Sequence, residues 1–192
     1  MNLRVMLVDR DPQRAELLEA ALAAAGHRVI ARINDDANLA AEVAKRQPDV
    51  IVIDMEAPGR DTLEQMREIA RDRPKPIILF SDERDPAYIR QAVQAGVSAY
   101  VVDGLSRDRV MPIVEVAVAR FREFQSLRDE LESAKTELAD RKVIDKAKGL
   151  LMQKKKMSED AAYQFLRKTA MSRNLKLIEV ARVLIALEET LL

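Results

Sequence analysis

The sequence has no cysteine and no tryptophan, and it has a single histidine, His27. Without cysteine, neither a disulfide nor a thiolate metal site is possible. A zinc site would need three carboxylates beside the one histidine, and no spacing of acidic residues indicates such a cluster. We therefore predict no zinc site, and we place His27 at the surface, in a turn between a helix and a strand.

Aromatic residues make up only 4% of the 192 residues, which argues against the base-stacking sheets of some RNA-binding domains. No apolar run approaches the roughly 20 residues that span a bilayer, and the first residues have the pattern of a strand rather than of a signal peptide. These absences predict a soluble, cytoplasmic protein. Hydrophobic residues make up 48% of the chain, which is enough for one ordinary domain and a smaller one.

Charge is unevenly distributed although the net charge is zero. Residues 1–123 carry 18 basic and 21 acidic side chains, and residues 124–192 carry 14 and 11. Residues 141–182 alone carry 12 basic and 4 acidic side chains, a net charge of +8. Lysine and arginine that neutralise phosphates supply most non-specific affinity for nucleic acid. This segment is either a nucleic-acid-binding surface or a solvated helical surface, and charge alone does not decide between them.

Strand and helix patterns alternate along the first part of the chain. The predicted strands are residues 3–8, 28–33, 50–54, 76–81 and 99–102, and the predicted helices between them are 12–25, 35–46, 62–73 and 86–95. This alternation predicts an α/β fold, a parallel sheet with helices on both faces. Functional residues then lie at the carboxyl ends of the strands. We expect Asp9, Asp54, Ser81 and Asp103 to share one edge of the sheet.

A long helix is predicted from residue 107 to residue 152, with Pro112 in its first turn. Within it, apolar residues at spacings of three and four form the seam of a short coiled coil: Phe124, Leu127, Leu131, Ala134 and Leu138. We interpret residues 121–140 as a linker that pairs two copies of the chain in a homodimer. The alternative is a helix packed on its own domain.

Two further helices, 161–172 and 176–190, are predicted to pack with the end of the long helix. Ser158 has the character of an N-cap, and acidic residues follow it in the first turn. The residues that we expect on the shared apolar faces are Ile144, Ala147, Gly149, Leu150, Leu151, Met152, Ala162, Phe165, Leu166, Thr169 or Ala170, Leu177, Val180, Ala181, Leu184 and Leu187.

Four strand ends together resemble the receiver domain of bacterial response regulators over about residues 1–120. The motifs that carry the resemblance are VDRDP, IDMEAPG, FSDE and AYVVDG. It implies a flavodoxin-like five-stranded parallel sheet and a phosphoryl-accepting aspartate at Asp54. It also implies an acidic pair that begins with Asp9 and holds Mg²⁺, a phosphoryl-binding hydroxyl at Ser81, and an aromatic switch residue at Tyr100.

Two positions depart from the receiver pattern. Arg10 stands where the second acid is expected, and Asp103 stands where the receiver has a lysine. Arg10 dilutes the negative charge that a metal needs, although Asp11 partly restores it, and Asp103 would repel a phosphoryl group. We predict a degenerate receiver without cofactor, a switch rather than an enzyme, with Mg²⁺ at Asp9 and Asp54 disfavoured. Either Arg10 pairs with Asp54 or Asp103 in place of the missing cation, or these positions have changed because the site is no longer used.

The C-terminal part resembles the ANTAR domain over about residues 125–187. The pattern consists of Arg141, Ile144, Ala147-Lys148-Gly149, Leu151-Met152, Ala162-Tyr163, Leu166-Arg167, Ala170 and Val180-Ala181. The resemblance implies the three-helix RNA-binding output of AmiR/NasR-type antitermination regulators, and the degenerate receiver points to the NasT group. That group binds paired stem-loops in a leader transcript and prevents terminator formation. It is held by a nitrate- or nitrite-sensing protein of the NasS type.

For RNA contacts we predict Lys148, Lys154, Tyr163, Arg167, Lys168, Arg173 and Lys176. Lys148 and Arg167 are the strongest candidates because small neighbouring residues should let them project. Tyr163 either stacks on a base or packs in the core beside Phe165. The alternative function is a conventional phosphorylated response regulator with a DNA-binding or protein-interaction output, although helix 161–172 is more apolar than a DNA recognition helix.

Overall fold

The structure, a computed structural model, describes residues 2–34, 37–102 and 107–190. The chain forms two compact units, Met1–Gln125 and Ser126–Leu192. Within the described residues, no helix is both long enough and apolar enough to cross a membrane.

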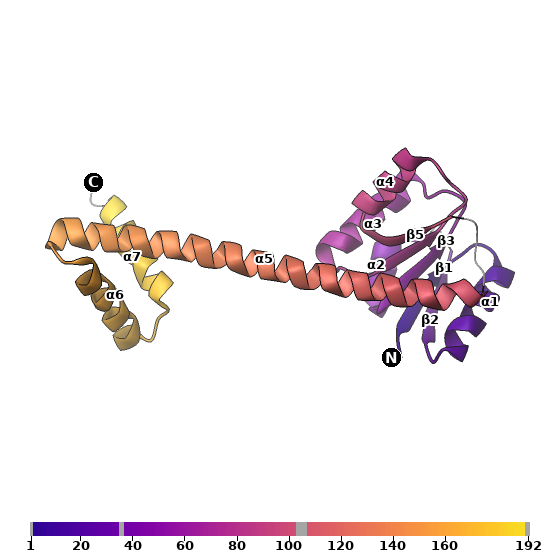
Figure 1. Cartoon of the computed structure of the whole chain (residues 1–192), viewed down its shortest axis with the longest axis horizontal. Helices are drawn as coiled ribbons and strands as arrows, with labels where there is room; N and C mark the ends of the chain where they lie inside the picture. Colours follow the sequence, from indigo (N-terminus) through magenta and orange to yellow (C-terminus); the bar gives the residue numbers. More distant parts are fainter. Residues whose placement is uncertain (1, 35–36, 103–106, 191–192) are drawn as a thin grey trace. The chain divides into compact units, whose positions relative to one another are not determined.

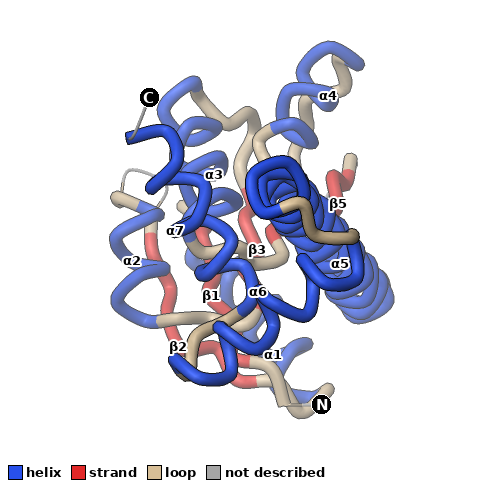
Figure 2. The backbone as a smooth tube through the Cα atoms, turned by 90° about the vertical axis from the view of Figure 1, so that its left-hand side faces the viewer, coloured by secondary structure: helices blue, strands red, loops and turns tan. Residues whose placement is uncertain are grey.

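Five parallel strands form the sheet of the first unit (Figures 1 and 2). The strands are β1 (Arg4–Val8), β2 (Arg28–Ile33), β3 (Val50–Asp54), β4 (Ile77–Phe80) and β5 (Val97–Val101). Their order is β2-β1-β3-β4-β5, so the predicted flavodoxin-like α/β fold is confirmed. Every residue of the central strand β3 is buried, as expected for a parallel strand covered on both faces.

Helices cover both faces of this sheet. They are α1 (Pro12–Ala24), α2 (Leu39–Arg46), α3 (Arg60–Asp72), α4 (Pro86–Gln94) and the start of α5 (Arg107–Lys155). Side chains of α1 and α5 pack on one face with Phe80 at its centre, whereas α2, α3 and α4 pack on the other face around Met6 and Met66. The two cores fix the carboxyl ends of the strands relative to one another.

One helix begins later than predicted. The sequence pattern indicated a helix from residue 35, but α2 begins at Leu39. Asn38 is its N-cap, and its side-chain oxygen accepts a hydrogen bond of 2.9 Å from the backbone N–H of Ala41. Residues 35 and 36, where the predicted helix begins, lie outside the described residues. Local capping therefore overrides the apolar periodicity here.

His27 is half-buried rather than a surface residue. Its Nδ1 accepts a hydrogen bond of 3.3 Å from the backbone N–H of Leu3, next to the first strand. His27 lies in the predicted turn between α1 and β2, but it is less exposed than predicted because the imidazole contacts the backbone just before β1.

The second unit consists of the C-terminal part of α5 with α6 (Glu159–Arg173) and α7 (Leu177–Thr190) (Figure 1). Its buried core is Ala147, Leu151, Ala162, Leu166, Ala170, Val180 and Ala181, as the predicted apolar faces required. Two predicted core residues are exposed: Met152 is 40% exposed and Leu187 is 60% exposed. Each lies at the edge of the row of apolar residues on its helix. Three short helices leave such edge positions uncovered.

Helix α6 begins and ends as its sequence indicates. The Ser158 hydroxyl accepts a hydrogen bond of 3.3 Å from the backbone N–H of Ala161. Asn174 closes the helix in the left-handed conformation, with φ of 53°, which asparagine tolerates better than most residues. These caps fix where α6 begins and ends.

Candidate functional site

Two buried carboxylates lie at neighbouring strand ends of the first unit. Asp9 follows β1 and Asp54 ends β3, and the two strands are adjacent in the sheet. Their side chains are only 1% and 8% exposed. Asp9 Oδ2 and Asp54 Oδ2 have no hydrogen-bond partner among the described residues. Ser81 follows β4 and is also buried, whereas Asp103 lies outside the described residues.

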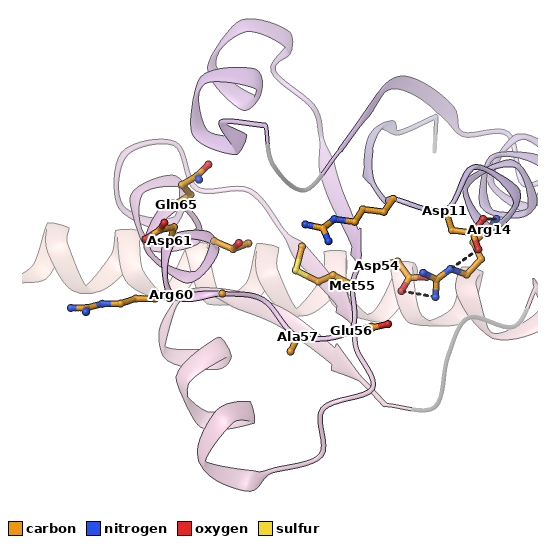
Figure 3. Close-up of a pocket in the computed structure, with 12 residues that line it drawn as sticks. Asp11, Arg14, Asp54, Met55, Glu56, Ala57, Arg60, Asp61 and Gln65 are labelled. Atoms are coloured by element: carbon orange, nitrogen blue, oxygen red, sulfur yellow. Dashed lines mark hydrogen bonds and ion pairs between the residues drawn. The ribbon is translucent and has the colours of Figure 1, made fainter.

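Arg14, in the first turn of α1, forms ion pairs with both carboxylates. Figure 3 shows Arg14 beside Asp54 and Asp11. Its guanidinium uses three different nitrogens: Nη2 lies 3.7 Å from Asp9 Oδ1, Nη1 lies 3.6 Å from Asp54 Oδ1, and Nε lies 3.4 Å from Asp11 Oδ2. Asp11 also caps α1, since its Oδ1 accepts a hydrogen bond of 2.9 Å from the N–H of Gln13. The cap therefore fixes the helix turn that carries Arg14.

Sequence reasoning missed Arg14. It predicted Arg10 as the replacement cation, and Arg10 lies before the start of α1 and lines the same cavity. A signal was nevertheless present: Arg14 is a basic residue in the first turn of a helix that has no acidic residue there, against the preference set by the helix dipole. Such a placement indicates a nearby anion, although it does not identify which one.

The environment of Asp54 favours its protonated form. Burial raises the pKa of this carboxyl from 3.8 to about 6, because a charged group loses its hydration in the protein interior. Arg14 lowers the pKa of Asp54, whereas the nearby carboxylates of Asp9, Asp82 and Asp11 raise it. Burial and like charges therefore outweigh the effect of the partly exposed Arg14 on the pKa of Asp54.

The hydroxyl of Ser81 is held within the protein. It donates a hydrogen bond of 2.6 Å to the carbonyl of Glu56 and accepts one of 3.2 Å from the N–H of Glu83. Tyr100, the predicted switch residue, is half-buried, and its hydroxyl donates to the carbonyl of Glu83 at 2.9 Å. The loops after β3 and β4 are thus joined through Ser81, and the loop after β4 is tied to β5 through Tyr100.

A cavity of about 760 Å³ opens beside Asp54 (Figure 3). Its lining includes both basic and acidic side chains from the ends of β1 and β3 and from α1 and α3: Arg10, Asp11, Arg14, Asp54, Glu56, Arg60 and Asp61. The mixture of charge signs favours neither an anion nor a cation as a ligand.

The second unit holds one of its predicted RNA-binding lysines internally. Lys148 Nζ lies 2.7 Å from Asp145 Oδ1 and 2.7 Å from Glu159 Oε1, and the side chain is only 15% exposed. These carboxylates raise the pKa of the Lys148 ammonium group through hydrogen bonds, Asp145 first and then Glu159. The expectation that Lys148 projects from the helix was wrong, because Glu159 at the start of α6 folds back onto it.

Two neighbouring lysines also have partners within this unit. Lys154 forms an ion pair with Glu188 of α7, and Lys155 Nζ lies 4.7 Å from the centre of the Phe165 ring, a cation–π contact. Arg182 Nη2 of α7 lies 3.3 Å from Asp140 Oδ1 of α5. These contacts join the end of α5 to α6 and α7 around the apolar core.

Four of the predicted RNA-binding basic residues are exposed on α6 or in the turn after it. Arg167, Lys168, Arg173 and Lys176 are exposed, and their side chains form no ion pair within the described part of the chain. Tyr163 is 39% exposed and lies four residues before Arg167, so the two share one face of α6. Tyr163 is not part of the buried core of this unit, which contains Ala162 and Leu166 of α6.

The predicted coiled-coil seam is exposed along α5. Phe124, Leu127, Leu131 and Leu138 are between 55% and 63% exposed. Single exposed apolar residues are common, but four at heptad spacing on one helix indicate a surface that another helix can cover.

Two family models match the chain: the response regulator receiver domain over residues 5–115 and the ANTAR domain over residues 132–185. The chain belongs to the ANTAR response regulators. Both domains are regulatory, so this chain is a regulator built from a receiver and a helical output domain.

Named relatives of this ANTAR response regulator include the transcriptional regulatory protein PdtaR of Mycobacterium tuberculosis, which is 31% identical over 160 residues. That alignment covers 83% of this chain and 78% of PdtaR. The nitrate regulatory protein of Klebsiella oxytoca is 39% identical over 80 residues, 42% of this chain and 19% of that protein. A solved response regulator of the LuxR family from Aurantimonas sp. SI85-9A1 is 26% identical, with a TM-score of 0.55, and the match covers 62% of this chain and 86% of that one.

The receiver family implies Mg²⁺ held by two acids after β1 together with the aspartate that ends β3. In this ANTAR response regulator two of those positions, Asp9 and Asp54, are acidic, the third is Arg10, and Arg14 pairs with both acids. No group of three or more potential metal-ligating side chains occurs among residues 2–34, 37–102 and 107–190. The residues present therefore do not fit a Mg²⁺ site while Arg14 is in place.

Proposed function

We propose that this ANTAR response regulator binds RNA hairpins through the exposed face of α6 and thereby prevents transcription termination. The observation that carries the proposal is the exposed set of Tyr163, Arg167, Lys168, Arg173 and Lys176 within an ANTAR domain. RNA loops present phosphates and unstacked bases, which suit arginine and lysine with an occasional aromatic side chain. Lys148 and Lys154 have a stabilising role in this proposal, since both pair with carboxylates of their own unit.

The regulator acts on a leader transcript in this proposal. Two hairpins in tandem are bound by two copies of the chain, joined through the seam of Phe124, Leu127, Leu131, Ala134 and Leu138. Binding holds the RNA in a conformation that excludes the terminator hairpin, so the polymerase continues. A homodimer suits this task because two linked sites raise the effective concentration of the second contact.

Nitrate or nitrite assimilation is the process that we propose to be controlled. The similarity to the nitrate regulatory protein of Klebsiella oxytoca supports it, as does the receiver whose Asp54 faces an arginine instead of a metal site. A NasS-like sensor protein would hold the regulator and release it when it binds nitrate or nitrite. Copurification of the two proteins, with and without each anion, tests this partnership.

RNA binding is tested by fluorescence anisotropy at one fixed salt concentration. The ligands are a tandem-hairpin leader RNA, an unpaired RNA of equal length and a duplex DNA. We expect the hairpin RNA to bind most tightly and the double variant Arg167→Ala, Lys168→Ala to weaken that binding at least about tenfold. The matched control is Lys135→Ala, an exposed lysine of α5 outside the α6 face, which should bind as the parent does.

Other outcomes identify the alternatives. Preference for duplex DNA would indicate a conventional response regulator with a DNA-binding output. Hairpin affinity that is unaffected by the α6 substitutions would indicate that the basic face serves a protein partner. In either case the α6 proposal is wrong.

A further inference from the structure

The guanidinium of Arg14 in the receiver lies close to three carboxylates, each beside a different nitrogen. Arg14 Nη2, Nη1 and Nε each lie against a different residue, Asp9, Asp54 and Asp11, at 3.4 to 3.7 Å. Two of these acids are almost fully buried, whereas Arg14 remains 44% exposed. The side chain thus extends from solvent over the two buried carboxylates and brings a positive charge within 4 Å of each.

We propose that Arg14 is a built-in counter-ion that replaces the divalent cation at this receiver and excludes it. A metal bound by Asp9 and Asp54 would have to share their oxygens with a positive charge less than 4 Å away. Displacement of Arg14 would also break its pair with Asp11, the residue that caps α1. The state of the receiver is therefore independent of Mg²⁺.

The position of Arg14 in the fold supports a fixed role. The Asp9 Oδ1 atom accepts the backbone N–H of Asp11 at 2.7 Å, so the loop between β1 and α1 is anchored to the same carboxylate. Asp11 then begins α1, and Arg14 follows within the first turn. Loop and cap are both anchored at the strand end, so the backbone that carries Arg14 is fixed beside Asp9.

The proposal concerns the receiver alone and does not depend on RNA binding by α6. Its test uses the full chain with MgCl₂ as the probe, at constant ionic strength, in isothermal titration calorimetry and in thermal unfolding followed by circular dichroism. The parent chain should show no saturable Mg²⁺ binding and no Mg²⁺-dependent shift of its unfolding midpoint. Arg14→Gln should show saturable Mg²⁺ binding, at least about tenfold tighter than the weakest binding that the parent titration could have detected, equivalent to about 1.4 kcal/mol, and its midpoint should rise with Mg²⁺.

Three variants test whether the effect belongs to the positive charge at position 14 and to the strand ends. Arg32→Gln is the matched control, because Arg32 also makes a loose, partly exposed ion pair, 3.7 Å from Glu19, and it should behave as the parent does. Adding Asp54→Asn to Arg14→Gln should abolish the gain, which assigns the bound ion to the strand ends. Arg14→Lys keeps a positive charge at this position and should keep Mg²⁺ binding weak.

Several results would overturn the proposal. Saturable Mg²⁺ binding by the parent that Asp54→Asn removes would show that Arg14 does not exclude the metal. An unchanged Arg14→Gln, together with a gain in Arg10→Asp, would assign the exclusion to the missing acid instead. If Arg14→Gln does not fold, the parent titration and Arg14→Lys still decide, since Mg²⁺ binding by either chain at Asp54 contradicts the proposal.

Discussion

Lys148 Nζ lies 2.7 Å from Glu159 Oε1, so the end of α5 is joined to the first turn of α6 by an ion pair. Asp145 contacts the same ammonium group at 2.7 Å, one turn earlier on α5. Lys148, which we predicted among the RNA contacts, is thus paired with two acids of its own unit. Its neighbour in the pattern, Arg167, is exposed on α6. Substitution of Lys148 should therefore affect stability, whereas substitution of Arg167 should affect RNA affinity.

Substitution of Lys148 and of Arg167 should separate stability from RNA affinity. Lys148→Met should lower the midpoint of thermal unfolding because Glu159 and Asp145 lose their shared partner. Arg167→Met should leave the midpoint unchanged and weaken hairpin binding about threefold to tenfold, with a smaller salt dependence. Circular dichroism melts and anisotropy titrations at several salt concentrations measure both effects. If Lys148→Met weakened hairpin binding and Arg167→Met lowered the unfolding midpoint, the proposed RNA-binding role of α6 would be contradicted.

Asp54→Asn should alter the pH dependence of stability. The folded-state pKa of about 6 lies above the ordinary value of 3.8, so folding favours the protonated carboxyl. The carboxyl therefore costs no stability below pH 3.8, costs more as the pH rises towards 6, and reaches its full cost above 6. We expect Asp54→Asn to be the more stable chain at pH 8, by at most about 3 kcal/mol, and to approach the parent near pH 4.

Urea unfolding at a series of pH values measures this difference. Asp61→Asn is the control, because Asp61 is an exposed acid that lines the same cavity. Parent and Asp54→Asn curves that run parallel from pH 4 to pH 8 would show that burial does not perturb Asp54.

Gly96→Ala should destabilise the receiver more than Gly26→Ala does. Both glycines have positive φ, 98° and 81°, so each substitution introduces backbone strain of about 1 to 2 kcal/mol. At Gly96 the added Cβ would also lie 2.4 Å from Ala70 Cβ, whereas at Gly26 it meets no atom within 4 Å. Gly59→Ala, with ordinary φ and open space, controls for the loss of glycine. Equal losses at positions 96 and 26 in urea unfolding would argue against the contact with α3.

Leu131→Asp should weaken self-association without unfolding either unit. Leu131 is 55% exposed at the middle of the seam, and a carboxylate there would be desolvated between paired helices. Sedimentation velocity over a range of protein concentrations should show the dimer dissociating at least about tenfold more readily. Ser133→Asp places the same charge on an exposed position off the seam and should leave association unchanged. Identical behaviour of the two variants would mean that the seam does not pair two copies.

The element pattern could be predicted closely because it depends on local sequence. Alternating strands and helices, the N-cap at Ser158 and the C-terminal stop at Asn174 all follow from periodicity and short-range capping. The buried core of the C-terminal unit was predicted in the same way, except at Met152 and Leu187 on the edges of their stripes. Asn38 was the local signal that the predicted start of α2 overlooked.

The sequence by itself determined the strand–helix order, the family motifs and which strand ends carry acids, since each of these is written in neighbouring residues. Only the tertiary structure decided that Arg14 is the cation beside Asp54 and that Lys148 pairs with Glu159. Both pairings join different elements, and long side chains reach whichever charge the packing brings within a few ångströms. Periodicity places a residue on a face, but the distance between two charges depends on how the elements that carry them pack.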